Sequence, residues 1–193
     1  MSTARKHVFG PVPSRRLGLS LGVDLVPRKV CTQDCVYCQV GRTTECVVQR
    51  GDFVPVDEVV GEIARVLPHV PRPDYITMSG SGEPTLNVRL GDVIDGVRGV
   101  TDVAVAVLTN GTLLTEADVR RDCAKADRVV PSLAAADEAT FQSINRPARG
   151  LTLSGLVNGL VAFRRQFHGQ LWLEVFLAAG RNDSDEQVAA MGR

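Results

Sequence analysis

Aromatic residues are scarce in this sequence, which has one tryptophan, two tyrosines and six phenylalanines among 193 residues. RNA-binding domains commonly stack unpaired bases on aromatic rings, so this scarcity argues against a large RNA-stacking surface. Net charge is also absent, because 22 basic residues balance 22 acidic ones. A neutral chain has no strong overall attraction for nucleic acids, membranes or acidic substrates.

Long apolar runs are missing too. The N-terminal segment lacks the apolar core of a signal peptide, and no stretch is apolar enough for a transmembrane helix. We therefore expect a cytoplasmic protein without a membrane partner. Its five cysteines are an odd number, and three of them lie within eight residues. This pattern fits a reducing cytosol and the ligation of a metal or cluster better than a framework of disulfides.

One domain is expected over residues 1–193, because the length and the 44% of hydrophobic residues suffice for one sizeable core. Residues 1–18 contain two prolines and three arginines among turn-forming residues, and they predict an irregular N-terminal leader. Basic residues outnumber acidic ones ahead of Cys31. They form either a local anion-binding patch or ordinary solvated surface charge.

Strands and helices are expected to alternate after residue 18. The apolar pattern predicts strands at 19–26, 75–79, 103–108, 127–133 and 171–177, and helices at 56–67, from about 115, and at 151–167. Repeated βα units imply parallel strands joined by right-handed crossovers. The fold class is thus α/β, with either a doubly wound sheet or a barrel.

The conspicuous motifs all follow predicted strands. A cysteine-rich loop follows the first strand, the turn at 80–84 the second and the turn at 109–111 the third, and Ser132 closes the fourth. In parallel α/β folds, functional residues gather at the carboxyl ends of the strands. The shared position predicts that these motifs meet in one site.

The cysteine loop has the spacing C-x3-C-x2-C, formed by Cys31, Cys35 and Cys38. Three thiolates on a four-iron cluster leave one iron open to a small molecule. A zinc ion is the alternative, with Cys46 as fourth ligand of a structural site or water as fourth ligand of a catalytic one. No histidine lies near the loop, which favours the cluster.

These residues resemble the radical S-adenosylmethionine superfamily, whose signature is this cysteine spacing with an aromatic residue, here Tyr37, before the last cysteine. Further segments are similar to one subgroup of largely uncharacterised iron–sulfur oxidoreductase-like proteins, related to the enzymes that build the tricyclic wyosine base of tRNA. They are residues 10–18, 79–86, 108–114 and 144–147.

The resemblance implies a partial (β/α)6-type TIM-like barrel with two cofactors, a 4Fe-4S cluster and S-adenosylmethionine. In the superfamily, the open iron binds the amino and carboxylate groups of S-adenosylmethionine. An electron from the reduced cluster breaks the bond from sulfur to C5′, and the 5′-deoxyadenosyl radical takes a hydrogen atom from the substrate. The implied partner is a small electron donor of the flavodoxin or ferredoxin type, and a tRNA base is the suggested substrate.

Candidate cofactor contacts follow from the same resemblance, and Tyr37 is counted among them. Ser81, Gly82 and Glu83 lie in a turn expected to meet the amino group of S-adenosylmethionine, where glycine admits a close backbone and a carboxylate complements the ammonium. Asn110 is expected at the corresponding place after the third strand. Ser132 is expected at the ribose or carboxylate of S-adenosylmethionine. Asn110 and Ser132 also suit a turn or a helix cap.

Glu174 shares one face of the last predicted strand with Trp172 and Phe176, while the leucines and Val175 share the other face. If the leucine face packs against helices, Glu174 points into the barrel. A buried carboxylate needs a partner, so Glu174 is expected either to contact the cofactor or substrate or to pair with an arginine.

Two departures from the superfamily pattern bear on activity. The subgroup usually carries an aspartate where this sequence has Ala134, so one polar contact is expected to be missing. The superfamily core has six βα units, whereas Arg193 falls in the fifth helix, which predicts a short barrel or a truncated member with an open edge beside strand 171–177. Two other functions are therefore kept, an electron-transfer or cluster-carrying protein and an inactive paralogue.

Overall fold

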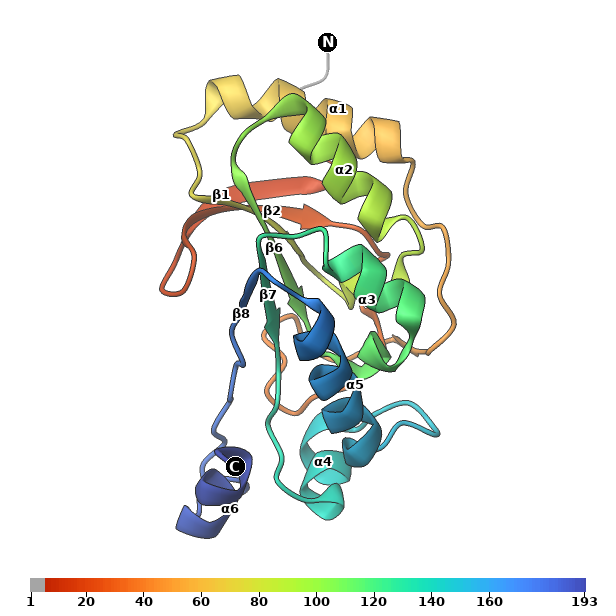
Figure 1. Ribbon diagram of the computed structural model, residues 1–193, viewed down its shortest axis with the longest axis vertical. Coiled ribbons are helices and arrows are strands. Elements are labelled where there is room, and N and C mark those ends of the chain that lie inside the picture. The colour runs from red at the N-terminus through yellow and green to blue at the C-terminus, as the bar shows by residue number, and fades with distance from the viewer. Residues whose placement is uncertain (1–5) are drawn as a thin grey trace.

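Six strands form the main sheet of the computed structural model, which describes residues 6–193 (Figure 1). The order across the sheet is β1-β2-β5-β6-β7-β8. The strands are Val8–Ser14 (β1), Gly18–Asp24 (β2), Tyr75–Ser79 (β5), Ala104–Thr109 (β6), Arg128–Pro131 (β7) and Gln170–Leu171 (β8). β1 runs antiparallel to β2, and every other neighbouring pair is parallel. The predicted α/β class is confirmed, and the described sheet is a partial barrel whose edges are β1 and β8.

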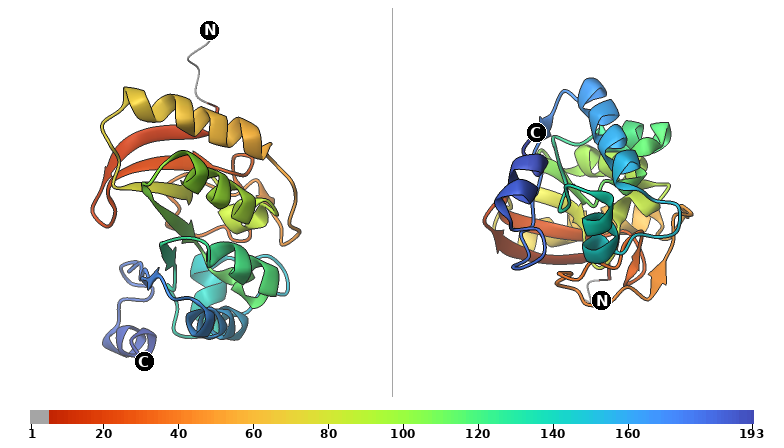
Figure 2. Two further views of the ribbon diagram at one scale, coloured as in Figure 1. Left: turned by 45° about the horizontal axis from the view of Figure 1, so that its top comes forward. Right: turned by 90° about the horizontal axis from the view of Figure 1, so that it is seen from below.

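Helices alternate with the parallel strands, as predicted. They are Val56–Val66 (α1), Leu90–Val100 (α2), Ala117–Cys123 (α3), Glu138–Asn145 (α4), Leu153–Gln166 (α5) and Asp185–Met191 (α6), with short 3-10 turns at Leu67–His69 (η1), Pro84–Leu86 (η2) and Thr112–Thr115 (η3). α1, α2, α3 and α5 cover one face of the sheet, and α6 lies at the end of the segment that leaves β8 (Figures 1 and 2). Within residues 6–193, no helix combines the length and the apolar character that crossing a membrane requires.

The two faces of the sheet differ in chemistry. Val23 of β2 and Ile76 and Met78 of β5 are fully buried in the core between the sheet and the helices. Ser20 and Thr77 alternate with these residues and face the other way, where their hydroxyl groups lie 2.6 Å apart. Because side chains alternate across a strand, one set of strands builds both an apolar core and a polar inner face. The functional site lies on that inner face.

The prediction of an irregular leader over residues 1–18 is wrong for residues 8–14, which form β1. Pro11 and Pro13 are compatible with a strand here because β1 is an edge strand. A strand at the edge pairs on one side only, so a residue without an N–H need not break a hydrogen bond to a second neighbouring strand. The pairing with β2 also shifts register between Phe9 and Val12. Residues 1–5, the start of the predicted leader, lie outside the described residues.

The last predicted strand, 171–177, is also wrong in extent, because β8 is only Gln170–Leu171. Pro131 of β7 has no N–H, so the ladder is interrupted, although the main-chain N–H of Glu174 still donates to the Pro131 carbonyl at 2.8 Å. The leucine face does not pack against helices, since Leu173 is 45% and Leu177 is 51% exposed. The chain here is extended and only partly paired.

A buried carboxylate fastens the start of β1 to α1. Glu62 accepts hydrogen bonds from the main-chain N–H groups of Lys6, His7 and Val8, at 2.9, 3.0 and 3.1 Å. Glu62 itself is buried, whereas Glu58, one turn earlier on the same helix, is exposed. The carboxylate therefore fixes the edge strand without any sheet partner on that side.

We expect Glu62→Ala to lower the free energy of unfolding by about 3 kcal/mol, because it leaves three main-chain N–H groups without their acceptor. Urea denaturation followed by circular dichroism measures the change. The matched control is Glu58→Ala, which removes an exposed pair with Lys6 and a 3.7 Å contact with His7 but no main-chain hydrogen bond, so the midpoint should change much less. Equal midpoints for the two variants would contradict the role assigned to Glu62.

Candidate functional site

A cavity of about 300 Å³ lies on the inner face, at the carboxyl ends of the parallel strands. It collects every predicted site residue except Ser81: the lining includes Cys31, Cys35, Tyr37, Cys38, Gly82, Glu83, Asn110, Ser132 and Glu174. Ser81 lines an adjoining cavity that shares Gln39, Val40, Ser79, Gly80 and Leu108 with the first. A larger cavity of about 530 Å³ lies elsewhere, beside α3, and no cysteine lines it.

The cysteine loop is fixed from behind by the end of α4. It leaves strand β3 (Val30–Cys31), which pairs in parallel with β4 (Glu45–Cys46). The main-chain N–H of Val36 donates to the Ile144 carbonyl at 2.8 Å, and that of Asp34 donates to the Asn145 and Arg146 carbonyls at 3.1 Å. The carbonyls that α4 leaves free at its C-terminus thus find partners in the loop.

Each of the three sulfur atoms lies near a nitrogen donor from a different part of the chain. Lys29 Nζ is 3.1 Å from Cys38 Sγ, Asn145 Nδ2 is 3.5 Å from Cys35 Sγ and Asn110 Nδ2 is 3.6 Å from Cys31 Sγ. Thiolates that ligate iron accept hydrogen bonds, and such bonds tune the cluster. Three thiols on one cavity, each with a donor behind it, fit a 4Fe-4S cluster.

Burial shapes the chemistry of the first thiol. Loss of solvation is the main cause that raises the pKa of Cys31 to about 12, and the nearby Glu83 adds to it. Iron must displace the proton of such a thiol, because the thiolate is the ligand. Among residues 6–193, no three His, Cys, Asp or Glu side chains lie close enough together to bind one metal ion.

The other cysteines stand apart from the cavity. Cys46 lies in register with Cys31 across the β3–β4 pair, but it is exposed and does not line the cavity. Cys123 of α3 is buried in the main core.

Glu83 is 2% exposed and its carboxylate accepts four hydrogen bonds. The donors are the N–H and the hydroxyl of Thr85, the hydroxyl of Thr109 and the N–H of Asn110, at 2.7 to 3.1 Å. Burial raises the pKa of Glu83, while these bonds act to lower it. The carboxylate therefore ties the turn after β5 to the end of β6. Its contact with the amino group of S-adenosylmethionine stays a prediction.

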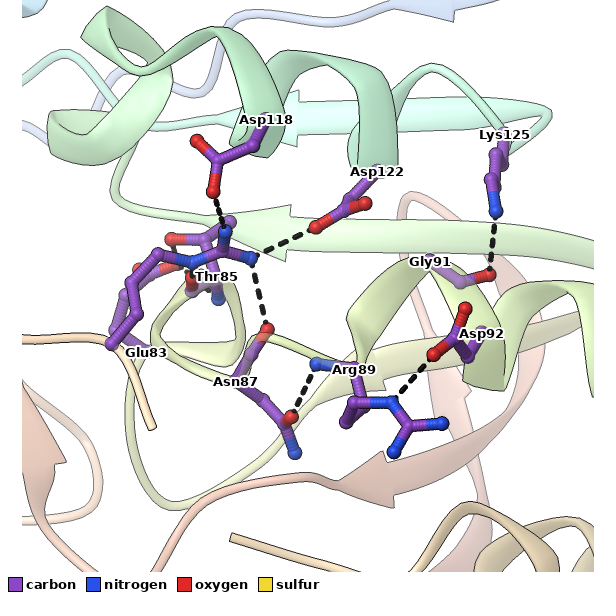
Figure 3. A network of polar contacts seen from close by, with 10 residues as sticks. Glu83, Thr85, Asn87, Arg89, Gly91, Asp92, Asp118, Asp122 and Lys125 are labelled. Carbon is purple, nitrogen blue, oxygen red and sulfur yellow. Dashed lines mark hydrogen bonds and ion pairs between the residues drawn. The ribbon is translucent and has the colours of Figure 1, made fainter. Parts of the chain in front are cut away.

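A second polar network holds the same turn from the side of α3 (Figure 3). The Arg50 guanidinium donates to the carbonyls of Thr85 and Asn87, at 2.9 and 3.0 Å. It also pairs with Asp118 and Asp122, both on α3 and both labelled in Figure 3. The turn thus has fixed partners on two sides.

Gly82 is required where the glycine turn passes the cysteine loop. A Cβ atom at Gly82 would lie 2.1 Å from the Val30 carbonyl oxygen and 2.6 Å from Val26 Cγ2. The adjacent N–H of Glu83 donates to that same carbonyl at 3.0 Å. Only a residue without a side chain allows the two segments to approach so closely.

Asn110 and Ser132 occupy the ends of their strands as predicted. Asn110 Nδ2 donates to the Thr32 hydroxyl at 2.7 Å, so this residue joins β6 to the cysteine loop. Ser132 forms an isolated bridge with Glu174, and Glu174 pairs with Arg16, whose side chain also lines the cavity. The structure thus contains the arginine pair that was one alternative for Glu174, and the other alternative, a contact with the cofactor or substrate, stays a prediction.

The alanine at the expected aspartate position does not line the cavity. Ala134 is buried, and its carbonyl accepts a hydrogen bond from Asn182 Nδ2 at 2.8 Å. Ser81 donates to Asp24 through its N–H at 3.1 Å and through its hydroxyl. Its expected contact with the cofactor stays a prediction.

Four residues of the site had no role in the sequence analysis. Phe176 stacks on Tyr37 with ring centroids 4.2 Å apart, and Asn145 donates to the Tyr37 hydroxyl at 2.9 Å. Arg16 and Lys29 were seen only as members of a basic stretch. Two of them could have been found from the sequence. Asn145 lies in the segment 144–147 that is similar to the subgroup, and Phe176 shares a face of the predicted last strand with Glu174.

The family comparison agrees with this geometry. The model of the radical SAM superfamily matches residues 25–192, which is most of the chain. The protein belongs to the radical SAM superfamily, and the predicted resemblance is confirmed.

Individual proteins are also similar to this chain. Over 183 residues the chain is 44% identical to the GTPase Obg of Brachyspira hyodysenteriae, covering 95% of this chain and 27% of that protein. It is 36% identical over 182 residues to a UPF0026 protein of Methanocaldococcus jannaschii, covering 93% of this chain and 56% of that protein. The chain thus spans about a quarter and just over half of these relatives.

A solved structure of TYW1 with a lysine-pyruvate adduct bound is similar in fold. The TM-score is 0.64 at 18% identity, and the match covers 92% of this chain and 63% of that chain. At such low identity the likeness supports the fold and leaves the substrate open.

We expect Gly82→Ala to destabilise the protein by about 2 kcal/mol, because the added methyl group must displace main chain. It should also reduce the cluster content after reconstitution, measured as iron per chain. Gly61→Ala in α1 is the control, since a Cβ there meets nothing within 4 Å. Normal stability and iron content in Gly82→Ala would refute the close approach.

Proposed function

We propose that this protein is a radical enzyme that binds a 4Fe-4S cluster on Cys31, Cys35 and Cys38 and cleaves S-adenosylmethionine reductively. The observation that carries the proposal is the one cavity that brings the three thiols together with Gly82 and Asn110. When bound, the cluster supplies the electron that breaks the bond from sulfur to C5′ and so releases the 5′-deoxyadenosyl radical. The hard chemistry belongs to the cofactors, and the protein binds, orients and shields them.

The residues of this chain supply that binding and shielding. Gly82 lines the cavity, where we expect its main chain to meet the methionine end of S-adenosylmethionine, and Glu83 keeps the turn in position. Asn110 and Ser132 present polar atoms to the remainder of the cofactor. Phe176, which stacks on Tyr37, adds an apolar ring to the lining of the cavity.

The electron donor is proposed to be a small acidic protein of the flavodoxin or ferredoxin type. Arg28, Arg42 and Arg146 are exposed around the cysteine loop, and the last two lie 3.7 Å from Asp34, next to Cys35. Cations close to a redox centre attract acidic partners electrostatically. The same cations suit a tRNA phosphate, so a tRNA base stays a prediction for the substrate.

An electron-transfer protein is the second candidate function, favoured by the proximity of Cys46 to Cys31 across the β3–β4 pair. A fourth thiolate would fill the open iron and prevent binding of S-adenosylmethionine. The two functions differ in whether adenosine products form and in whether Cys46 is needed.

Anaerobic reconstitution with iron and sulfide, then dithionite and S-adenosylmethionine, tests the proposal by chromatography of 5′-deoxyadenosine. We expect product from the unmodified protein and at least a hundredfold less, about the assay background, from Cys35→Ala, which loses a cluster ligand. Cys46→Ala is the matched control and should keep both cluster and product. Loss of the cluster in Cys46→Ala, or a cluster that never yields product, would instead support the electron-transfer function.

A further inference from the structure

Lys29 is held in an unusual place, two residues before Cys31. It is a buried lysine, 5% exposed, with a backbone φ of 64°. The left-handed region is sparsely populated by residues other than glycine, and such backbone persists only where its surroundings determine it. The contacts around Lys29 therefore hold its main chain in a conformation that lysine rarely adopts.

Hydrogen bonds on both sides fix the Lys29 main chain. Its N–H donates to the Ser81 carbonyl at 2.9 Å, and its carbonyl accepts from the N–H groups of Thr44 and Glu45 at 3.1 and 3.3 Å. The glycine turn after β5 and the start of β4 thus hold the residue between them. This arrangement aims the side chain at the cysteine loop, where Nζ lies 3.1 Å from Cys38 Sγ.

Among residues 6–193, the ammonium of Lys29 has no carboxylate partner. In the described part of the chain, no acidic oxygen lies within 4.0 Å of Nζ, whereas other cations such as Arg16, Arg50 and Lys125 have such partners. A buried charge is costly unless an opposite charge or strong hydrogen bond compensates it. The sulfur of Cys38 is the partner present, and as a thiolate on iron it would carry the negative charge that the ammonium needs.

The donors to the other two sulfur atoms are neutral. Asn145 and Asn110 each offer a side-chain amide, at 3.5 and 3.6 Å, which is longer than the Lys29 contact. Hydrogen bonds from charged groups are stronger than those from neutral ones. Lys29 is therefore the one positive side chain in this set of donors, and its effect on the cluster should exceed that of either asparagine.

We propose that Lys29 is a tuning residue that raises the reduction potential of the cluster by donating a charged hydrogen bond to Cys38; the proposal rests on the cluster-binding function above. On reduction the cluster gains one electron from an external reductant, no bond breaks, and no proton moves. The added negative charge is stabilised by a cation that is already in place. Reduction by a weak biological donor is thereby favoured.

An anaerobic redox titration of the reconstituted cluster with dithionite, read by electron paramagnetic resonance, tests this proposal. We expect Lys29→Met to disfavour reduction about tenfold, a fall of about 59 mV for one electron. Lys29→Gln keeps a neutral donor and should fall less, and Lys29→Arg should stay close to the unmodified protein. Lys125→Met, which removes a lysine bound to Asp95 away from the cavity, is the control.

The outcomes separate the two proposals. An unchanged potential in Lys29→Met would overturn the tuning role even if the protein makes 5′-deoxyadenosine. Failure of both Lys29→Met and Lys29→Gln to take up iron would also overturn it, because the lysine would then be needed to build the loop. If the unmodified protein forms no cluster, the proposed function fails first, and the tuning role fails with it.

Discussion

Glu83 accepts four hydrogen bonds inside the protein, and the geometry of the site depends on them. Two come from Thr85 in its own turn, and two come from Thr109 and Asn110 at the end of the next strand. A buried carboxylate is tolerated only when such donors satisfy it. The ends of β5 and β6 therefore cannot separate without leaving the buried carboxylate short of hydrogen-bond donors. Asn110 then carries the constraint to the cysteine loop through Thr32.

The cysteine loop is therefore positioned by contacts that are far apart in the sequence. Its front meets the glycine turn after β5, its side meets Asn110 after β6, and its back rests on the end of α4. Hydrogen bonds of this kind contribute modestly one by one but strongly when a network is complete. A rigid loop suits cluster ligation, because three thiolates must keep their relative positions in two oxidation states.

Patterns within a few residues were sufficient to predict much of this protein. The strand Tyr75–Ser79 has the predicted bounds, and the motifs after successive parallel strands do meet in one cavity. The edge strand at 8–14 was missed because its two prolines argue against a strand when only the local sequence is considered. A strand tolerates proline when it lies at the edge of a sheet, and the local sequence does not show that position. The last strand was overextended because the interruption arises at Pro131, forty residues earlier in the chain.

The contacts of Lys29 and Asn145 with the cysteine sulfur atoms could not be predicted from the sequence for a related reason. Asn145 lies 110 positions from Cys35, and only the packing of α4 brings the amide to the sulfur. Lys29 is close to the cysteines in sequence, but its direction depends on a left-handed backbone that no residue pattern indicates. Sequence spacing predicts which ligands share a loop, while the donors behind them depend on tertiary structure.

The open barrel is closed on its inner side by side chains instead of a strand ladder. Arg16, at the tip of the β1–β2 hairpin, pairs with Glu174 beyond β8, so opposite edges of the sheet are connected across the cavity. Arg128 lies between the rings of Tyr75 and Trp172, at 4.7 and 3.6 Å from their centroids, and its guanidinium donates to the Arg16 carbonyl. The Arg16–Glu174 pair is partly exposed, with side-chain exposures of 41% and 35%, and an exposed ion pair is weaker than a backbone ladder. The connection between the two sheet edges on this side of the cavity is therefore weaker than the hydrogen-bond networks that hold the cysteine loop and the glycine turn.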